Sequence, residues 1–131
     1  MIDHIDFAVA DLPTSRAFYC RVLAPLGIVP ILDIERGDGH EGTGFGRDSS
    51  PQFWIGGGSS IVGRFHVAFE AESRSAVDMF YKEAIEAGGT FKGEPGPRPR
   101  YGDHYYAAFV LDPDGHTIEA VCRRRESGGT P

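Results

Sequence analysis

Three side chains, His4, His66 and Glu119, have the types that could hold a divalent metal ion. Two neutral imidazoles and one carboxylate supply three ligands and leave coordination positions open for a substrate or for oxygen. A set of this kind suits Fe(II), and related sets suit Mn, Ni, Co or Zn. Taken singly, a strand histidine is more often a surface residue than a ligand, and a glutamate on an open face is usually solvated. The hypothesis therefore depends on the elements that position the three residues.

An internal repeat is the first clue to those elements. A shift of 62 residues superimposes similar residues at several places in one register: His4 on His66, Phe7 on Phe69, Phe18-Tyr19 on Phe80-Tyr81, and Gly27 on Gly89. One coincidence would mean little, but several in one register indicate a duplicated module. The sequence thus predicts two copies of one unit, spanning about residues 2–56 and 64–123 of a single domain, 1–131.

Each copy has the pattern of a strand, a helix and three further strands. The first strands are expected at 3–9 and 65–70, where apolar residues alternate. Helices are expected at 12–24 and 74–87, with Asp11 and Ser73 as N-caps and glycines at the ends. The remaining strands are expected at 28–35, 41–47 and 52–56 in the first copy, and at 90–94, 105–111 and 116–122 in the second. The predicted fold class is α+β, with two tandem βαβββ modules whose mixed sheets curl around a cavity.

Strand parity places the three candidate ligands on comparable faces. Side chains alternate between the two faces of a strand, and the apolar row of each strand should face the helices. His4 and His66 do not belong to the apolar rows of their strands. Their side chains are therefore expected to point away from the helices. Glu119 lies opposite the apolar row of the last strand. Two modules curled around a shared cavity would aim all three side chains into it.

Composition excludes several classes of partner. The net charge is −6 and the pI is about 5.3, whereas nucleic-acid binders usually carry a basic stripe. No apolar run approaches the roughly 18 residues of a membrane span, and no signal peptide precedes the first strand. We therefore expect a soluble, cytoplasmic protein with no nucleic-acid or membrane partner. Cys20 and Cys122 do not form a Cys-x-x-Cys pair and are interpreted as small buried apolar residues.

Two segments of the chain resemble a known superfamily. Residues 4–12, His-Ile-Asp-Phe-Ala-Val-Ala-Asp-Leu, followed by Ala17-Phe18-Tyr19, are similar to the opening of a vicinal-oxygen-chelate module. Residues 109–119, Phe-Val-Leu-Asp-Pro-Asp-Gly-His-Thr-Ile-Glu, resemble the closing hairpin of the same superfamily, which includes glyoxalases, extradiol dioxygenases and bleomycin-resistance proteins. The resemblance covers about residues 2–123. It implies paired βαβββ modules around a cavity, and it matches His4, His66 and Glu119 to the three metal ligands of the dioxygenases.

Trp54 departs from one branch of this superfamily. Glyoxalase I uses a fourth protein ligand from the last strand of its first module, and Trp54 stands at that position in this sequence. An indole cannot replace a carboxylate or an imidazole as a ligand. The resemblance therefore implies a three-ligand site closer to that of the dioxygenases, although those enzymes usually have longer chains of four modules.

The segment 93–106 is the candidate ligand loop. It is rich in Pro and Gly, and loops that carry aromatic and titratable groups often contact ligands. Arg98 or Arg100 could hold an anionic substrate, and His104 or Tyr105 could act as an acid or base. The alternative is a solvated connection stiffened by prolines. His116, next to Thr117 in the final turn, is expected to be exposed.

Two classes of function remain open. In the first, the protein is an enzyme of lyase or dioxygenase type, whose divalent metal binds adjacent oxygens of a small substrate and stabilises their charge, with Glu119 taking part in catalysis. In the second, it is a metal-free binder of a small molecule or drug, in which Trp54 and the tyrosines offer stacking surfaces. Exposed sheet edges and the resemblance both indicate a homodimer.

Overall fold

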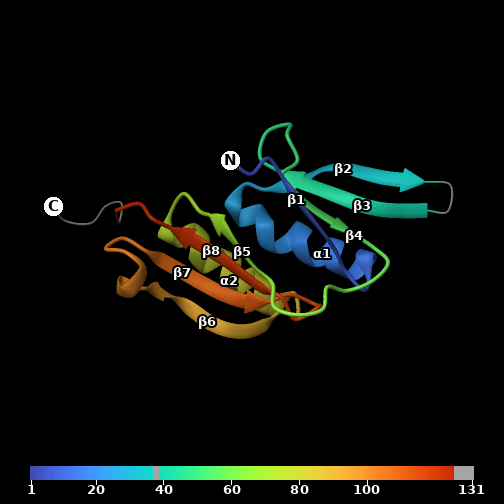
Figure 1. Cartoon of the computed structure of the whole chain (residues 1–131). Coiled ribbons are helices and arrows are strands. Elements are labelled where there is room, and N and C mark those ends of the chain that lie inside the picture. Colours follow the sequence, from blue (N-terminus) through green and yellow to red (C-terminus); the bar gives the residue numbers. More distant parts are fainter. Residues whose placement is uncertain (37–38, 126–131) are drawn as a thin grey trace.

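The computed structural model describes residues 1–36 and 39–125, which form two modules of the same construction (Figure 1). The first contains β1 (Ile5–Ala8), α1 (Leu12–Leu23), the short 3-10 helix η1 (Ala24–Leu26), β2 (Val29–Arg36), β3 (Gly39–Gly46) and β4 (Phe53–Gly56). The second contains β5 (His66–Glu70), α2 (Arg74–Glu86), β6 (Thr90–Pro97), the 3-10 helix η2 (Pro99–Tyr101), β7 (Tyr106–Leu111) and β8 (Thr117–Cys122). This order confirms the predicted βαβββ repeat.

The two sheets have equivalent topology. Their strand orders are β1-β4-β3-β2 and β5-β8-β7-β6, and neither sheet closes on itself. In each, the first and last strands of the module are parallel neighbours, whereas the other pairs are antiparallel. β6 runs to Pro97, beyond the predicted end at residue 94, and its prolines are tolerated because it is an edge strand. The α+β fold class is confirmed.

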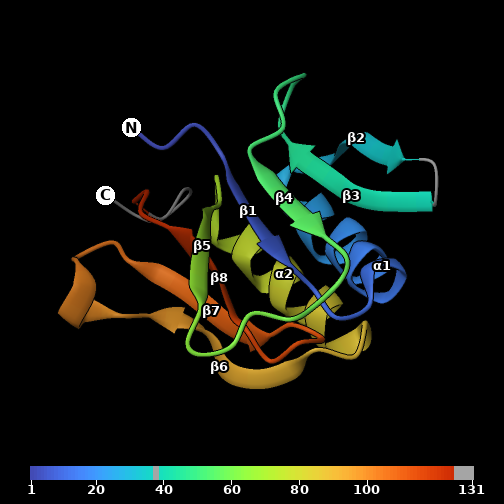
Figure 2. The same ribbon diagram turned by 45° about the vertical axis from the view of Figure 1, so that its right-hand side comes forward.

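Both helices begin and end where their capping residues predict. The side chain of Asp11 accepts a hydrogen bond from the Thr14 amide, and that of Ser73 accepts one from the Ala76 amide. Gly27 ends the first helical region with φ of 76°, in the left-handed region that favours glycine. Figure 2 shows α1 and α2 behind the two sheets, so the opposite faces of the sheets are left for other contacts.

A shared core joins the modules. The buried cluster combines residues of both halves: Phe7, Phe18, Tyr19 and Phe53 from the first, and Phe69, Phe80, Val110 and Ile118 from the second. The rings of Phe7 and Phe65 lie 4.5 Å apart, across the junction between β1 and the start of β5. No helix in the described ranges is long and apolar enough to span a membrane.

The turn between β7 and β8 differs from expectation at one residue. Its Gly115 amide donates to the Asp112 carbonyl as a β-turn requires, and Asp112 Oδ1 accepts from the amides of Asp114 and His116. His116, however, is 3% exposed and not at the surface as predicted. Its ring packs edge-on against Phe7 and Phe65. Phe7 belongs to the other module, and local sequence cannot reveal such long-range packing.

Candidate functional site

His66 and Glu119 meet on the face of the second sheet that points away from α2. Because β5 and β8 are parallel neighbours, with His66 opposite Thr117 and Ala68 opposite Glu119, the two side chains share that face. His66 Nε2 lies 2.8 Å from Glu119 Oε1. The Glu119 side chain is 3% exposed and that of His66 is 42% exposed. A buried carboxylate and a more accessible imidazole thus form the centre of the site.

Tyr105 is the third member of this group. Its hydroxyl donates a hydrogen bond to Glu119 Oε2, the oxygen that His66 does not contact. Burial, followed by this hydrogen bond to Glu119, raises the pKa of Tyr105 to about 12. The phenol therefore keeps its proton at neutral pH and acts as a donor to the carboxylate.

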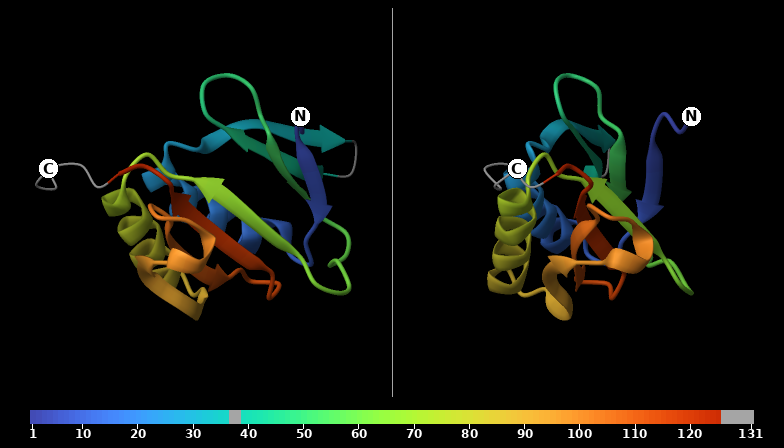
Figure 3. Two further views of the ribbon diagram at one scale, coloured as in Figure 1. Left: turned by 60° about the vertical axis from the view of Figure 1, so that its left-hand side comes forward. Right: turned by 90° about the vertical axis from the view of Figure 1, so that its left-hand side faces the viewer.

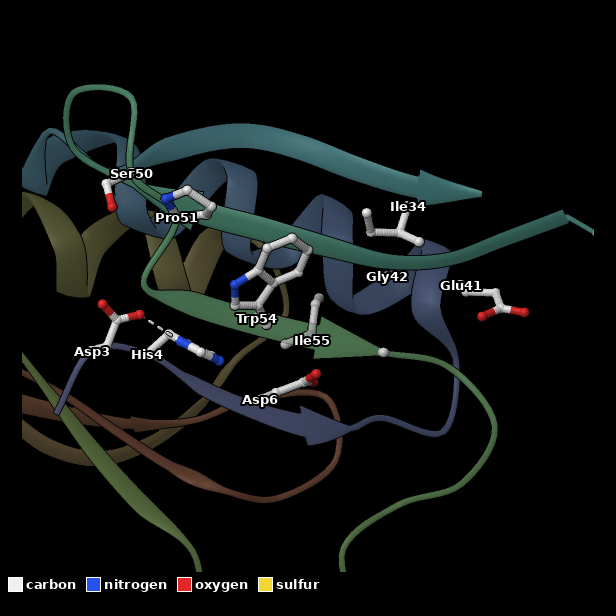
Figure 4. Close-up of a pocket in the computed structure, with 11 residues that line it drawn as sticks. Asp3, His4, Asp6, Ile34, Glu41, Gly42, Ser50, Pro51, Trp54 and Ile55 are labelled. Atoms are coloured by element: carbon white, nitrogen blue, oxygen red, sulfur yellow. Dashed lines mark hydrogen bonds and ion pairs between the residues drawn. The ribbon is translucent and has the colours of Figure 1, made fainter. Parts of the chain in front are cut away.

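His4 lies in a different place. It precedes β1 and lines a cavity of about 520 Å³ on the outer face of the first sheet, together with Asp3, Asp6 and Trp54 (Figure 4). Its Nδ1 is 2.6 Å from Asp3 Oδ1, and its side chain is 56% exposed. With Nδ1 bonded to Asp3, Nε2 is the ring nitrogen that remains available to a ligand.

The three predicted ligands therefore do not converge within one chain. No group of three or more His, Cys, Asp or Glu side chains in the described part of the chain is arranged to hold a metal ion. In Figure 3, β1 and β5 run in opposing directions. Because His4 immediately precedes β1 and His66 is the first residue of β5, these directions set the two histidines at opposite ends of the two strands. His66 and Glu119 do come together, whereas His4 belongs to the other sheet.

The His66 and Glu119 pair nevertheless fits a divalent ion. Two donors about 2.1 Å from one ion lie about 3.0 Å apart when they subtend a right angle there. The observed 2.8 Å between Nε2 and Oε1 is close to that value. An imidazole beside a carboxylate is also a donor set that transition metals accept. The pair would supply two ligands to such an ion, and a complete set would require a third from elsewhere.

Comparison with known proteins decides the family. The model of the Glyoxalase/Bleomycin resistance protein/Dioxygenase superfamily matches residues 1–120. The chain belongs to this superfamily. No curated protein sequence matches it significantly.

Solved structures of the superfamily have the same fold. A glyoxalase/bleomycin resistance protein from Albidiferax ferrireducens T118 is 28% identical, with a TM-score of 0.73 over 93% of this chain and 98% of that chain. A putative glyoxalase from Bacillus halodurans is 24% identical, with a TM-score of 0.66 over 93% and 95% of the two chains. The fosfomycin resistance protein FosX from Listeria monocytogenes, an E126Q mutant complexed with Mn(II) and 1S,2S-dihydroxypropylphosphonic acid, is 22% identical. Its TM-score is 0.67 over 92% of this chain and 88% of that chain.

Strand register shows which residue of the second module corresponds to Trp54. Trp54 lies opposite Asp6 in the β1–β4 pair, as Glu119 lies opposite Ala68 in the β5–β8 pair. Trp54 is therefore the counterpart of Glu119 in the first module. Its indole covers Gly44, where a Cβ would lie 2.7 Å from two ring carbons. The first sheet thus presents an aromatic surface where the second presents a carboxylate.

The remaining predicted site residues belong to the segment that leads into β7. Arg98 stacks on Phe109 and donates to the carbonyl oxygens of Glu94 and Pro97, so its guanidinium braces β6. The guanidinium of Arg100 lies over the Tyr101 ring. His104 is exposed in the turn before Tyr105. Only Tyr105 of this segment reaches the His66 and Glu119 pair through a hydrogen bond within the described residues.

Sequence reasoning gave no role to Asp3 or Asp6. Asp6 shares the outer face of β1 with His4 and lines the same cavity. Strand parity could have indicated Asp6, because it alternates with the apolar residues Ile5 and Phe7 in β1 and so lies on the face away from the helices. The contact between Asp3 and His4 joins adjacent residues, for which strand parity predicts opposite faces. Since His4 precedes β1 in the structure, that rule does not apply to it.

Proposed function

We propose that the protein is a divalent-metal-dependent enzyme of its superfamily, acting on a small molecule that carries adjacent oxygens. The observation that supports this most strongly is the contact between His66 Nε2 and buried Glu119 Oε1. Burying a carboxylate is costly unless it is paired, so a buried glutamate beside an accessible imidazole favours a binding role. The Mn(II) in the FosX complex belongs to that protein, and it makes Mn(II) the first ion to test here.

The third ligand in this proposal is His4 from a second copy of the chain. His4 has an available Nε2 and stands beside an edge strand, and β5, which carries His66, is an edge strand too. Exposed edges are commonly covered by another chain. A symmetric dimer would bring the first sheet of one copy to the second sheet of the other, twice. We therefore propose a homodimer with two shared sites.

In such a site the bound ion would act as a Lewis acid that stabilises negative charge on substrate oxygens. The chain's own residues would bind and orient the substrate. Trp54 offers a flat surface, and Arg100 or Arg98 could contact an anionic group. His104, exposed in the turn before Tyr105, is the candidate acid or base, while Tyr105 keeps its proton and donates a hydrogen bond to Glu119.

A metal-free binding protein is the second candidate, and the cavity on the first sheet favours it. Its volume of about 520 Å³ falls within the range of roughly 300–1,000 Å³ of small-molecule pockets. Trp54 and Ile34 supply apolar surface, and Asp6 supplies charge. This cavity does not require His66 or Glu119.

Metal-dependent stabilisation distinguishes the two candidates. Ions that bind only the folded state raise the melting temperature, by an amount that grows with the logarithm of the ion concentration once that concentration exceeds the Kd. We expect Mn, Fe(II), Ni, Co or Zn to raise the melting temperature of the native protein but not that of Glu119→Gln or His66→Ala. Glu119→Gln keeps the side-chain shape, so the metal-free variant should remain folded while its metal affinity falls by more than about tenfold.

The matched control is Glu70→Gln. Glu70 is an exposed carboxylate on the same face of β5, without the contacts of Glu119. It should keep the metal response. A native melting curve that none of these ions changes would contradict the enzyme proposal and favour the metal-free binder.

A further inference from the structure

We infer that Tyr105 is a positioning residue. Its hydrogen bond occupies one oxygen of Glu119 and leaves the other oxygen to bind a metal ion. This inference rests on the proposed function, because it concerns how the chain prepares the same carboxylate. Tyr105 Oη donates to Oε2, and His66 Nε2 contacts Oε1. Each oxygen of the carboxylate therefore has a different neighbour, and only the oxygen beside His66 adjoins another candidate ligand.

Burial makes the contact with Tyr105 consequential. The Glu119 side chain is 3% exposed, so water has little access to replace a lost donor. A charged acceptor left without its partner in such a place loses a large part of its stabilisation. Loss of the Tyr105 hydroxyl would therefore leave Glu119 Oε2 without its hydrogen bond inside the sheet, and the carboxylate would no longer be held in one orientation.

Tyr105 is itself held in place from several sides. Its backbone carbonyl accepts a 2.7 Å hydrogen bond from the Arg98 amide, and its amide donates to the Gly102 carbonyl at 3.3 Å. The guanidinium of Arg123 lies 4.9 Å from the centre of its ring, and the Tyr101 ring lies 5.4 Å away. The proline-rich segment before β7 therefore holds the Tyr105 hydroxyl in position to donate to Glu119.

The hydrogen bond between Tyr105 and Glu119 Oε2 should affect which ions bind well. Ca²⁺ often takes both oxygens of a carboxylate and collects six to eight oxygen ligands. Mn(II), Co(II) and Zn(II) accept a nitrogen and a single carboxylate oxygen readily. Occupation of Oε2 by Tyr105 should therefore strengthen the binding of these ions and weaken that of Ca²⁺. Tyr105 is predicted to determine selectivity as well as affinity.

Tyr105→Phe removes the hydroxyl and leaves the ring beside Arg123. Loss of a residue that orients a metal ligand typically weakens metal binding by about 10- to 100-fold. We expect the Kd for Mn(II), measured from the electron paramagnetic resonance signal of free Mn(II), to rise by about that factor. The Kd for Ca²⁺, measured by calorimetry, should rise less or fall, so the preference for Mn(II) narrows. Tyr101→Phe is the control, since Tyr101 stacks on Tyr105 and has no hydrogen bond to Glu119 among the described contacts.

The outcomes separate the two proposals. If the native protein binds Mn(II) and Tyr105→Phe binds it equally well with the same preference over Ca²⁺, the role of Tyr105 is contradicted while the proposed function stands. If the native protein binds none of the ions, the proposed function itself fails. A smaller preference for Mn(II) over Ca²⁺ also excludes a merely structural role, because a general loss of folding would weaken the binding of all ions alike.

A second measurement on the native protein applies if Tyr105→Phe does not fold. With ¹³C-labelled tyrosine, the ring carbon that bears the hydroxyl reports its hydrogen bonding. The signal of Tyr105 should move when Zn(II) is added, because the charge on Glu119 is then shared with the ion, and the signal of Tyr101 should not. A Tyr105 signal that stays fixed at saturating Zn(II) would overturn the inference.

Discussion

At the scale of single residues, Glu119 and Trp54 show how one strand position serves two purposes. They occupy equivalent positions in the two modules, yet Glu119 is a buried carboxylate with two polar neighbours and Trp54 lies over a glycine. Strand alternation predicted that Glu119 would point away from the helix, because that depends only on its neighbours along the chain. The bond from Tyr105 could not be predicted, since it depends on how the segment before β7 folds back.

The close contact between Gly44 and Trp54 leads to a residue-level prediction. In Gly44→Ala, the added Cβ would lie 2.7 Å from the indole, so the ring must move off β3. Trp54 is the only tryptophan in the chain, so the intrinsic tryptophan fluorescence reports this movement alone. We expect a shifted emission maximum and weaker binding of any ligand that stacks on the ring.

Gly57→Ala is the control for this prediction. A Cβ at Gly57 would make ordinary contacts with Leu12, and its backbone φ is not in the left-handed region. Its emission spectrum should match that of the native protein. An unchanged spectrum in Gly44→Ala would contradict the contact seen between the ring and β3.

At the scale of elements, a buried hydrogen bond ties α1 of the first module to the β7–β8 turn of the second. Tyr19 Oη donates to Asp112 Oδ2 at 2.5 Å, and both residues are buried. The helix, the turn and their capping residues were all predicted from sequence. Their mutual contact was not, because Tyr19 and Asp112 are far apart in the chain and only packing brings them together.

Tyr19→Phe tests this contact and its dependence on pH. Burial, followed by the charge of Asp112, raises the pKa of Tyr19 well above 10 in the folded protein. The proton that the folded state retains stabilises it below about pH 10, and this contribution is lost as the pH rises from there toward the folded pKa. At neutral pH, the variant should lose about 1–3 kcal/mol in urea unfolding, because Asp112 is left short of a donor.

Above pH 10, the native protein should lose stability faster than Tyr19→Phe, by at most about 1.4 kcal/mol per pH unit. Tyr105, whose pKa is also raised, is present in both proteins. The difference between their free energies of unfolding therefore reports on Tyr19 alone. Parallel stability curves between pH 9 and 11 would contradict a protonated, buried Tyr19.

At the scale of the whole molecule, the repeat was the most predictable feature. It followed from matching residues such as His4 with His66, and the two sheets indeed have the same strand order. The relative placement of the modules was not predictable, because a duplicated pattern does not say which ends of β1 and β5 meet. That placement separates His4 from His66 and Glu119, and it is the reason for proposing that two chains share each site.

Mixing two defective variants tests this shared site most directly. His4→Ala and Glu119→Gln should each bind Mn(II) poorly alone. In a mixed dimer, His4 of the Glu119→Gln chain meets His66 and Glu119 of the His4→Ala chain, so one of the two sites is intact. After unfolding and refolding an equal mixture, we expect about one quarter of the native number of tight Mn(II) sites, since half of the dimers are mixed. If the native protein binds Mn(II) tightly but the two variants and their mixture do not, a site built from two chains is contradicted.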